Sequence, residues 1–283
     1  MPVSVSQALE EQGQAAADKA AGLRRPGRFL VGSMLAGAFI GVAAVLLLAV
    51  AGPMLAASSP YTKLVEGLVF GIGLTLVVFA GAELTTGNMM TAVQGAIVRR
   101  ITAADAAALI LGAFVGNLVG SVLFAWLVHG SGVITSGGAP GHTAPAFALL
   151  ASLVKAKAAE SGATLFFRGV LCNFLVCLAV WMAARTRSEG AKLTVIFWCL
   201  LAFVGSGFEH VVANMTYYAL GLFEHVPGAN AAAFARNLLL VGLGNLVGGG
   251  LLVGAAYAFL GRGPRVKGAG ESSESETPAS VPV

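Results

Sequence analysis

The chain has 283 residues, of which 57% are hydrophobic and 11% are charged. With a mean hydropathy of +0.84, it is too apolar for an ordinary soluble domain and has too little charge to cover the surface of one. Its net charge of +4 comes from basic residues scattered at the ends of apolar runs, without the basic cluster and interleaved aromatics of a nucleic-acid-binding surface. The composition predicts a protein that lies in a lipid bilayer and has no nucleic-acid partner.

The two ends of the chain differ from the apolar middle. The first 27 residues are polar and alanine-rich and lack the basic start and apolar core of a signal peptide, so we expect a cytoplasmic N-terminal segment at 1–27. Residues 263–283 are rich in Ser, Pro, Gly and Glu and cannot bury enough apolar surface to order themselves, which predicts a disordered cytoplasmic tail. Residues 28–262 then form the transmembrane domain.

Six apolar runs are each long enough to cross about 30 Å of hydrocarbon. They lie at residues 29–51, 64–82, 105–128, 164–184, 193–222 and 237–260. Glycine and alanine inside these runs allow close helix packing, as expected where lipid gives no hydrophobic drive to association. The fold class predicted is an all-α integral membrane protein with six transmembrane helices.

Basic residues in the loops predict the orientation. Twelve of the 17 Lys and Arg residues fall on the side that also carries both termini. The opposite side carries Lys63, Lys155, Lys157, Arg168 and Arg236. By the positive-inside rule, both termini are expected in the cytoplasm and the protein is expected to be a multi-pass protein of the cell's inner (plasma) membrane.

Two short motifs occur twice. The stretch GAELTTGNMM (81–90) aligns with GFEHVVANM (207–215) at a constant offset of 126, and GNLVG occurs at 116–120 and again at 244–248, an offset of 128. Two motif pairs with nearly the same offset indicate duplication of a three-helix unit. Because three crossings are an odd number, the second unit must enter the membrane from the opposite face, which predicts an inverted repeat.

The first of these motifs interrupts the second and the fifth run. Glycines at 81, 87, 205 and 207 permit backbone angles that a helix interior does not adopt, so helices 2 and 5 are predicted to be broken. Irregular backbone at membrane depth survives only where protein or a water-filled cavity satisfies it, and paired interruptions point to the permeation path. For four polar residues of the breaks we favour a structural role in tying helices together: Glu83, Asn88, Glu209 and Asn214. A carboxylate that faced the path would repel anions.

His210 replaces Leu84 of the first repeat and so breaks the internal symmetry. A lone buried histidine is more often a satisfied core residue, but its position in a helix break favours a role in the path. The ordinary pKa of histidine is about 6.5, so an imidazole in a dry constriction can donate a hydrogen bond to an anion and exchange a proton near physiological pH.

Four stretches resemble the signature stretches of the formate/nitrite transporter family, in order and spacing: GAELTTGNMM, RGVLCNFLVCLAVWMA (168–183), GFEHVVANM and NLLLVGLGNLVGG (237–249). The similarity covers essentially the whole membrane part. It implies an aquaporin-like fold of six spans in each protomer and a pentamer with one pore per protomer. Such proteins pass formate, nitrite or hydrosulfide, and some pass lactate or other small monocarboxylates.

The resemblance also implies residues of the substrate path. His210 is similar to the central pore histidine of the family, Asn173 to a polar pore partner, and Thr86 to the threonine of the loop that breaks span 2. Lys157 resembles the basic residue that attracts anions to the outer vestibule.

Four apolar positions match the narrow pore segments of the family: Phe70, Leu74, Leu84 and Phe203. A ring of hydrophobic side chains strips water from a passing anion and makes a bare charge expensive, so a neutral acid passes more easily. The chain departs from the usual pattern at Thr85, where many members have an aromatic residue, and at Leu240 and Gly242 of the sixth span. These departures allow an inner constriction that is wider or more polar than in other members, so the resemblance alone does not identify the substrate.

The function predicted is a channel or transporter for formate or nitrite, with proton-linked passage through the central-histidine pore. Hydrosulfide or a short monocarboxylate such as lactate is the alternative within the same fold. A neutral-solute channel of the aquaporin type is less favoured because the paired Asn-Pro-Ala boxes are missing.

No pattern in the sequence indicates an enzyme, a cofactor or a metal site. Cys172, Cys177 and Cys199 lie in apolar runs without metal or disulfide spacing. Ser206 and His210 could form a dyad on one helix face, but Gly-Ser-Gly is common in a chain with 38 glycines, and a protease has no need of a duplicated half.

Overall fold

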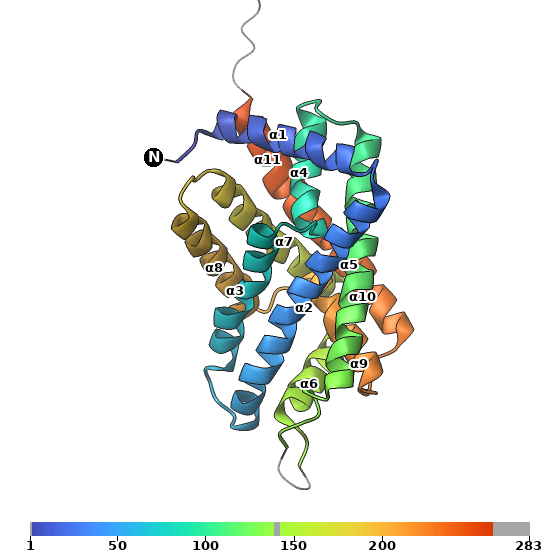
Figure 1. Cartoon of the computed structure of the whole chain (residues 1–283). Coiled ribbons are helices and arrows are strands. Elements are labelled where there is room, and N and C mark those ends of the chain that lie inside the picture. Colours follow the sequence, from blue (N-terminus) through green and yellow to red (C-terminus); the bar gives the residue numbers. More distant parts are fainter. Residues whose placement is uncertain (1, 139–141, 263–283) are drawn as a thin grey trace, which may run out of the picture.

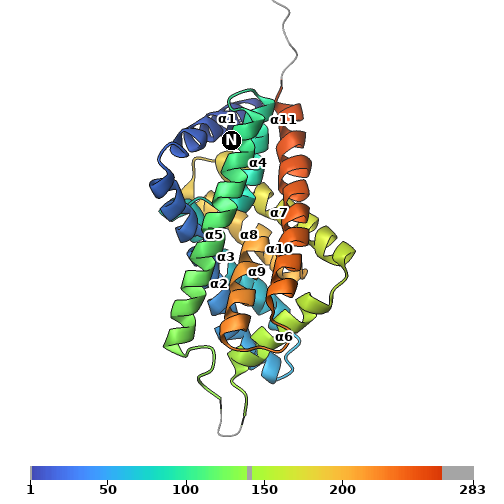
Figure 2. The same cartoon turned by 90° about the vertical axis from the view of Figure 1, so that its right-hand side faces the viewer.

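The computed structural model describes residues 2–138 and 142–262, and every regular element within these two stretches is helical. Figures 1 and 2 show a bundle whose long helices run between an end covered by α1 (Val5–Gly22) and an opposite end that carries α6 (Pro145–Ala159). The tail expected to be disordered, residues 263–283, lies outside the described residues.

The first half of the membrane domain contains four helices. Span 1 is α2 (Pro26–Ala56) and span 3 is α5 (Ala103–Ser131). Span 2 is broken into α3 (Thr62–Ala80) and α4 (Thr85–Ile97). The chain therefore crosses the membrane three times in this half, with one interruption.

The second half repeats this order. Span 4 is α7 (Gly162–Ala184), and span 5 is broken into α8 (Glu189–Gly205) and α9 (Val211–Phe223). Span 6 is continuous but changes its winding, and consists of α10 (Ala231–Leu246), the π-helix η1 (Val247–Ala255) and α11 (Ala256–Gly261).

The packing follows the repeat. In the first half α2 packs against α5 and α3, and in the second half α7 packs against α10 and α8. Within the described residues, five helical segments are long and apolar enough to cross a membrane, and the broken span of α8 and α9 supplies the sixth crossing. The prediction of an all-α, six-span inverted repeat with breaks in helices 2 and 5 is confirmed.

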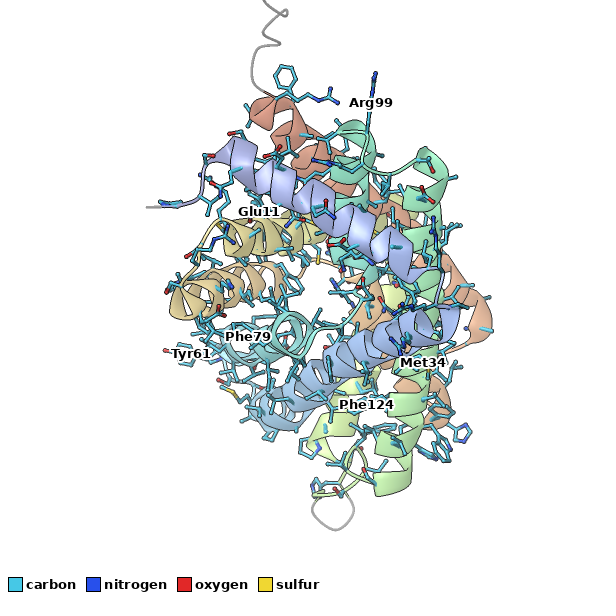
Figure 3. The ribbon with its side chains drawn as sticks, turned by 45° about the horizontal axis from the view of Figure 1, so that its top comes forward. Glu11, Met34, Tyr61, Phe79, Arg99 and Phe124 are labelled. Atoms are coloured by element: carbon cyan, nitrogen blue, oxygen red, sulfur yellow. The ribbon has the colours of Figure 1, made fainter. Side chains whose placement is uncertain are left out.

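Two helices are present that the sequence pattern did not predict, namely α1 and α6. Helix α1 begins where the Ser4 hydroxyl accepts the backbone N–H of Gln7, an ordinary N-cap. It buries Leu9 and three small residues, Ala8, Gly13 and Ala16. This one-sided burial docks a polar helix onto the end of the bundle. Glu11 of α1 and Arg99, which follows α4, lie at this end in Figure 3.

The short helices α4 and α9 form the centre of the bundle. Every residue of α9 from Val211 to Gly221 is buried, and so are nine of the thirteen residues of α4. A helix that is buried on all sides faces protein and not lipid. The two half-helices that follow the breaks are therefore held by the surrounding spans.

The glycines of the repeated GNLVG motif bring span backbones into direct contact. A Cβ on Gly120 would lie 1.9 Å from the Met34 carbonyl oxygen of α2, and one on Gly248 would lie 2.0 Å from the Val170 carbonyl oxygen of α7. Figure 3 labels Met34 on α2 and Phe124 on α5, two helices that pack against each other. Small residues thus set the distance between the first and third span of each half.

The π-helix η1 distinguishes span 6 from span 3. A Cβ on Gly249 would lie 2.3 Å from Asn173 Nδ2 and 2.6 Å from Cys177 Sγ. The wider winding occurs where α7 presents these side chains, and π-helical turns are frequent near functional sites.

We predict that Gly248→Ala lowers the stability of the folded protein, because the added methyl group would meet the backbone of α7. Overpacking of this kind costs about 1–3 kcal/mol. Gly27→Ala is the matched control, since nothing lies within 4 Å of its Cβ position. Thermal unfolding in detergent, followed by tryptophan fluorescence, measures both variants. An unfolding temperature for Gly248→Ala at or above that of Gly27→Ala would contradict the close contact.

Candidate functional site

Two glycines produce the breaks. Gly81 ends α3 with φ of 77° and Gly207 follows α8 with φ of 72°, in the left-handed region that favours glycine. Gly87 and Gly205, which the sequence pattern grouped with them, lie instead within α4 and at the end of α8. Each break thus depends on one glycine with a positive φ.

Asn117 of α5 satisfies the backbone of the first break. Its Oδ1 accepts the N–H of Thr85 at 2.9 Å, and its Nδ2 donates to the carbonyl oxygens of Glu83 at 2.9 Å and Ser33 at 2.7 Å. Unpaired backbone groups would be costly at membrane depth. One side chain therefore joins spans 1, 2 and 3.

Asn245 of span 6 does the same at the second break. Its Oδ1 accepts the N–H of Val211 at 3.0 Å, and its Nδ2 donates to the carbonyl oxygens of Glu209 at 3.0 Å and Gly169 at 2.8 Å. Asn117 and Asn245 are the asparagines of the two GNLVG motifs. Their letter-for-letter repetition was the available signal, but the role of the asparagines was not predicted.

The two break glutamates are each paired with a lysine and an asparagine. Glu83 Oε2 accepts from Lys19 Nζ of α1 at 2.5 Å and from Asn88 Nδ2 at 3.0 Å. The Lys19 partner was missed by the sequence reasoning because α1 was not expected to dock here.

In the second half, Lys157 Nζ donates to both carboxylate oxygens of Glu209, at 2.8 and 2.7 Å, and Asn214 Nδ2 donates to Oε2 at 2.7 Å. Asn214 also donates to Asn237 Oδ1 at 2.8 Å, another residue that the sequence reasoning did not single out. The lysine comes from α6, which connects the two halves.

His210 is the N-cap of α9. Its Nδ1 accepts the backbone N–H of Ala213 at 3.2 Å, and its Nε2 lies 3.1 Å from Thr86 Oγ1. Because Nδ1 is an acceptor, the proton of the neutral ring belongs on Nε2, which then donates to the Thr86 hydroxyl. Both ring nitrogens are engaged in these bonds, which leaves none for a dyad with Ser206.

Thr86 and Asn173 are fully buried. Asn173 Nδ2 donates to the carbonyl oxygens of Thr86 at 3.2 Å and Asn245 at 2.8 Å, and it lies 3.4 Å from Met89 Sδ. In this arrangement the Asn173 amide of α7 holds α4 and span 6 together through the backbone of Thr86 and Asn245.

An apolar cluster begins at one face of the His210 ring. The Phe203 ring stacks on it with centroids 6.0 Å apart, and Phe70 meets Phe203 edge-on at 5.7 Å. Leu74, one helical turn after Phe70, and Leu84, at the first break, are buried in the same core. The four apolar positions singled out in the sequence thus belong to one cluster.

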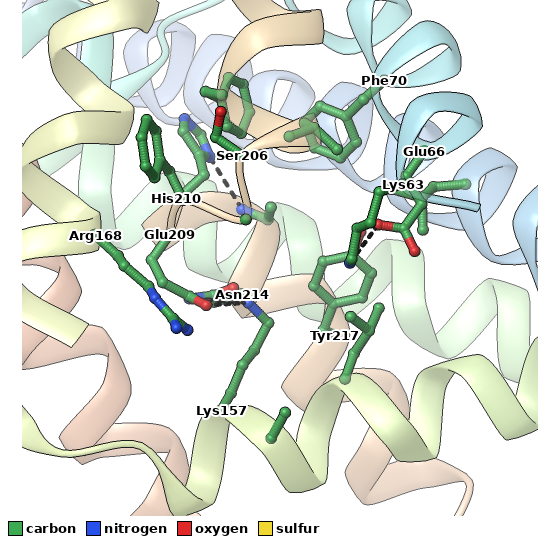
Figure 4. A pocket seen from close by; sticks show the side chains of 18 residues that line it. Lys63, Glu66, Phe70, Lys157, Arg168, Ser206, Glu209, His210, Asn214 and Tyr217 are labelled. Carbon is green, nitrogen blue, oxygen red and sulfur yellow. Dashed lines mark hydrogen bonds and ion pairs between the residues drawn. The ribbon is translucent and has the colours of Figure 1, made fainter. Parts of the chain in front are cut away.

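The apolar cluster lies between two cavities. We name the cavities for the orientation that the positive-inside rule predicts. The outer cavity, of about 290 Å³, is lined by polar residues including Lys63, Glu66, Lys157, Arg168, Glu209 and His210, with Phe70 and Phe203 in its wall (Figure 4). The inner cavity, of about 440 Å³, lies beneath α1 and is lined by Lys19, Glu83, Asn88, Leu74 and Leu84 among others. A polar cavity on each side of an apolar barrier is a geometry suited to transport.

Thr85 does not alter the barrier. Its hydroxyl donates to the Ile110 carbonyl oxygen of α5 at 2.9 Å, and the side chain is fully buried there. The sequence left open a more polar constriction at this position, but the hydroxyl is satisfied within the helix packing. Of the sixth-span departures, Leu240 lies near Gly162, and Gly242 faces Phe114 and Val211.

A family model and individual relatives agree on what this chain is similar to. The chain matches the formate/nitrite transporter family over residues 6–259. It is 41% identical to the nitrite transporter NirC of Salmonella typhimurium over 233 residues, 82% of each chain. It is also 33% identical to the formate channel BtFdhC of Bacillus thuringiensis over 229 residues, 81% of this chain and 85% of the relative.

Solved structures show the same likeness. An FNT family ion channel superposes with a TM-score of 0.82 at 38% identity, covering 90% of this chain and 98% of its own. A pentameric formate channel with formate bound superposes with a TM-score of 0.71 at 28% identity, covering 84% and 98%. With the two-cavity geometry and the match over nearly its whole length, the chain belongs to the formate/nitrite transporter family of membrane anion channels and is not an enzyme.

Proposed function

We propose that the chain passes formate or nitrite across the cytoplasmic membrane and that each anion crosses the barrier with a proton exchanged at His210. The observation that carries the proposal is the position of His210, between a cavity with cationic groups and a barrier of apolar side chains. The relatives named as a nitrite transporter and as a formate channel support these two anions as candidates.

The outer cavity can concentrate anions. Lys63 and Arg168 are partly exposed, with side-chain exposures of 57% and 40%, and both lie in the wall of the cavity. Lys157 lies deeper, bonded to Glu209 and 5.8 Å from the Tyr217 ring. The wall carries three cationic side chains against two carboxylates, Glu66 and Glu209, and a positive excess in a cleft with low-dielectric walls raises the local concentration of an anion.

The barrier favours a neutral permeant. A charge in the middle of a membrane costs at least about 2.5 kcal/mol even by lenient insertion scales, and Phe70, Phe203, Leu74 and Leu84 offer an anion no polar atoms. Formate and nitrite are conjugate bases of weak acids. One proton removes the charge before the barrier is crossed.

His210 can supply that proton. A proton taken up on Nδ1 displaces the Ala213 N–H bond and makes the ring cationic, and the Nε2 proton can then pass to the anion. The neutral acid leaves, a second proton from the outer cavity binds Nε2, and the Nδ1 proton then returns to that cavity, which restores the Nε2–H form. One proton accompanies each anion. The charged ring has lost its bond to the Ala213 N–H, which caps α9, and this loss limits how long the ring stays charged.

The arrangement of the termini supports a cytoplasmic end. Helices α1 and α11 contact each other, and Arg185 Nε donates to the Val3 carbonyl oxygen at 2.9 Å at the same end. We propose that this end faces the cytoplasm, in agreement with the positive-inside rule, and that Lys157 faces the outside.

We also propose a pentamer that conducts through its individual protomers. Large apolar side chains are exposed along α5, including Leu111, Val115 and Trp126, and these surfaces must meet lipid or neighbouring protomers. Native mass spectrometry in mild detergent should give five chains per particle. A monomer or a dimer under these conditions would contradict the assembly.

We predict that Lys157→Met weakens uptake most at low substrate concentration and low ionic strength, where screening is least. The single variant also leaves the Glu209 carboxylate unpaired, so the double variant Lys157→Met/Glu209→Gln is needed. A defect that persists in the double variant assigns the effect to the lost ammonium. Full recovery in the double variant would mean that Lys157 only neutralises Glu209. Lys155→Met is the matched control, because Lys155 is an exposed lysine of the same helix and does not line the cavity.

We predict that His210→Asn abolishes uptake driven by an inward proton gradient while the fold persists. Asparagine is a favoured N-cap, so it preserves the start of α9 and removes only the titration. The measurement is uptake of labelled formate and nitrite into proteoliposomes at outside pH of about 5 and about 8, values that bracket the ordinary histidine pKa.

His129→Asn is the control, because His129 is partly exposed at the far end of α5 and should have no effect on uptake. If His210→Asn retains the wild-type rate and pH dependence for both anions, the histidine is structural and the proton-linked mechanism is wrong.

A further inference from the structure

We propose that Asn245 is a positioning residue that sets the orientation of His210 and holds the neutral ring in its Nε2–H form. The inference rests on the proposed function, because it assigns a residue that controls the same proton exchange. Asn245 is fully buried and touches neither cavity, so any effect on transport must act through His210 and its neighbours.

The bonds of Asn245 bracket His210. The amide accepts the N–H of Val211, the residue after the histidine, and donates to the carbonyl of Glu209, the residue before it. A third bond, to the Gly169 carbonyl, ties the same amide to α7. All three partners are backbone atoms, so the asparagine fixes the main chain on both sides of His210 regardless of the neighbouring side chains.

The position of the main chain decides which ring nitrogen accepts. With the peptide groups around His210 held in place, α9 begins so that the Ala213 N–H points at Nδ1 at 3.2 Å. The ring proton is then left on Nε2, which faces the Thr86 hydroxyl. A shift of the break would weaken the Ala213 bond and remove the reason for one tautomer to dominate.

A network of hydrogen bonds connects both halves of the protein to Asn245. Asn173 Nδ2 donates to the Thr86 carbonyl and also to the backbone carbonyl of Asn245, while the Thr86 hydroxyl meets His210. The distance between Thr86, in the first half, and His210, in the second, is thereby set through span 6.

The repeat provides a matched control. Asn117 makes the same three bonds, to the Thr85 N–H and to the Glu83 and Ser33 carbonyls. The residue that it brackets is Leu84, which has no tautomer and makes no side-chain cap. Asn117→Ala and Asn245→Ala therefore remove equivalent bonds, but only the second removes them from the histidine.

The experiment compares Asn245→Ala and Asn117→Ala by two readouts. The first is the nitrogen NMR spectrum of ¹⁵N-histidine-labelled protein in lipid, which distinguishes Nδ1–H from Nε2–H. The chain has four histidines, and the signals of His210 are those missing in His210→Asn. The second readout is the pH profile of labelled formate uptake into proteoliposomes.

We expect a single Nε2–H form in the wild type and in Asn117→Ala, and a mixture of both forms in Asn245→Ala. The pH of half-maximal uptake should shift in Asn245→Ala alone, whereas Asn117→Ala should lower the rate without changing the profile. An unchanged tautomer in Asn245→Ala, or an equal shift in Asn117→Ala, would overturn the inference.

The outcomes separate this inference from the proposed function. If His210→Asn keeps the wild-type pH profile, the proton-linked mechanism fails, while the NMR spectra still test the positioning role. If Asn245→Ala does not assemble, Asn245→Ser is used in both readouts, because its shorter side chain with one hydroxyl cannot reproduce the three bonds of the amide. It should give a detectable admixture of Nδ1–H, and a spectrum and profile identical to wild type would refute the role of the amide.

Discussion

The structure depends on how two interruptions of the backbone are satisfied inside a membrane. At Gly81 and Gly207 the helical ladder stops, and lipid offers no water to bond the exposed peptide groups. Asn117 and Asn245 supply those bonds from the third span of each half. Without an amide at these positions, the breaks would leave buried unpaired groups, which are costly wherever they occur.

Because both breaks are stabilised in the same way, the two halves can place different side chains at equivalent positions of the same backbone structure. The residue at the centre of the first break is Leu84 and that of the second is His210, although Asn117 and Asn245 make the same backbone bonds around them. The glutamates are also alike, but Lys19 comes from the N-terminal helix and Lys157 from the connection between the halves. The asymmetry between the two halves thus arises from a few side chains and from two helices outside the repeat.

The candidate site was partly predictable from residue type. The apolar stretches containing Phe70 and Phe203, and the polar residues of the breaks, stand out in the sequence because of their contrast with their surroundings. The roles of Asn117 and Asn245 did not stand out, because an asparagine in a motif of small residues does not indicate which groups it will bond. Their bonds reach backbone groups 32 to 84 residues away, a separation that periodicity does not encode.

By itself the sequence determined the membrane location, the six crossings, the inverted repeat and the two breaks. These follow from local hydrophobicity, from the positions of glycines and from the similarity between two segments of the chain, none of which depends on how the helices pack. Only the tertiary structure decided that α1 covers the inner cavity, that Lys157 is bound to Glu209, and that the nitrogens of His210 face Ala213 and Thr86. Thr86 and His210 are 124 residues apart, so their contact exists only because the two halves pack around a common centre.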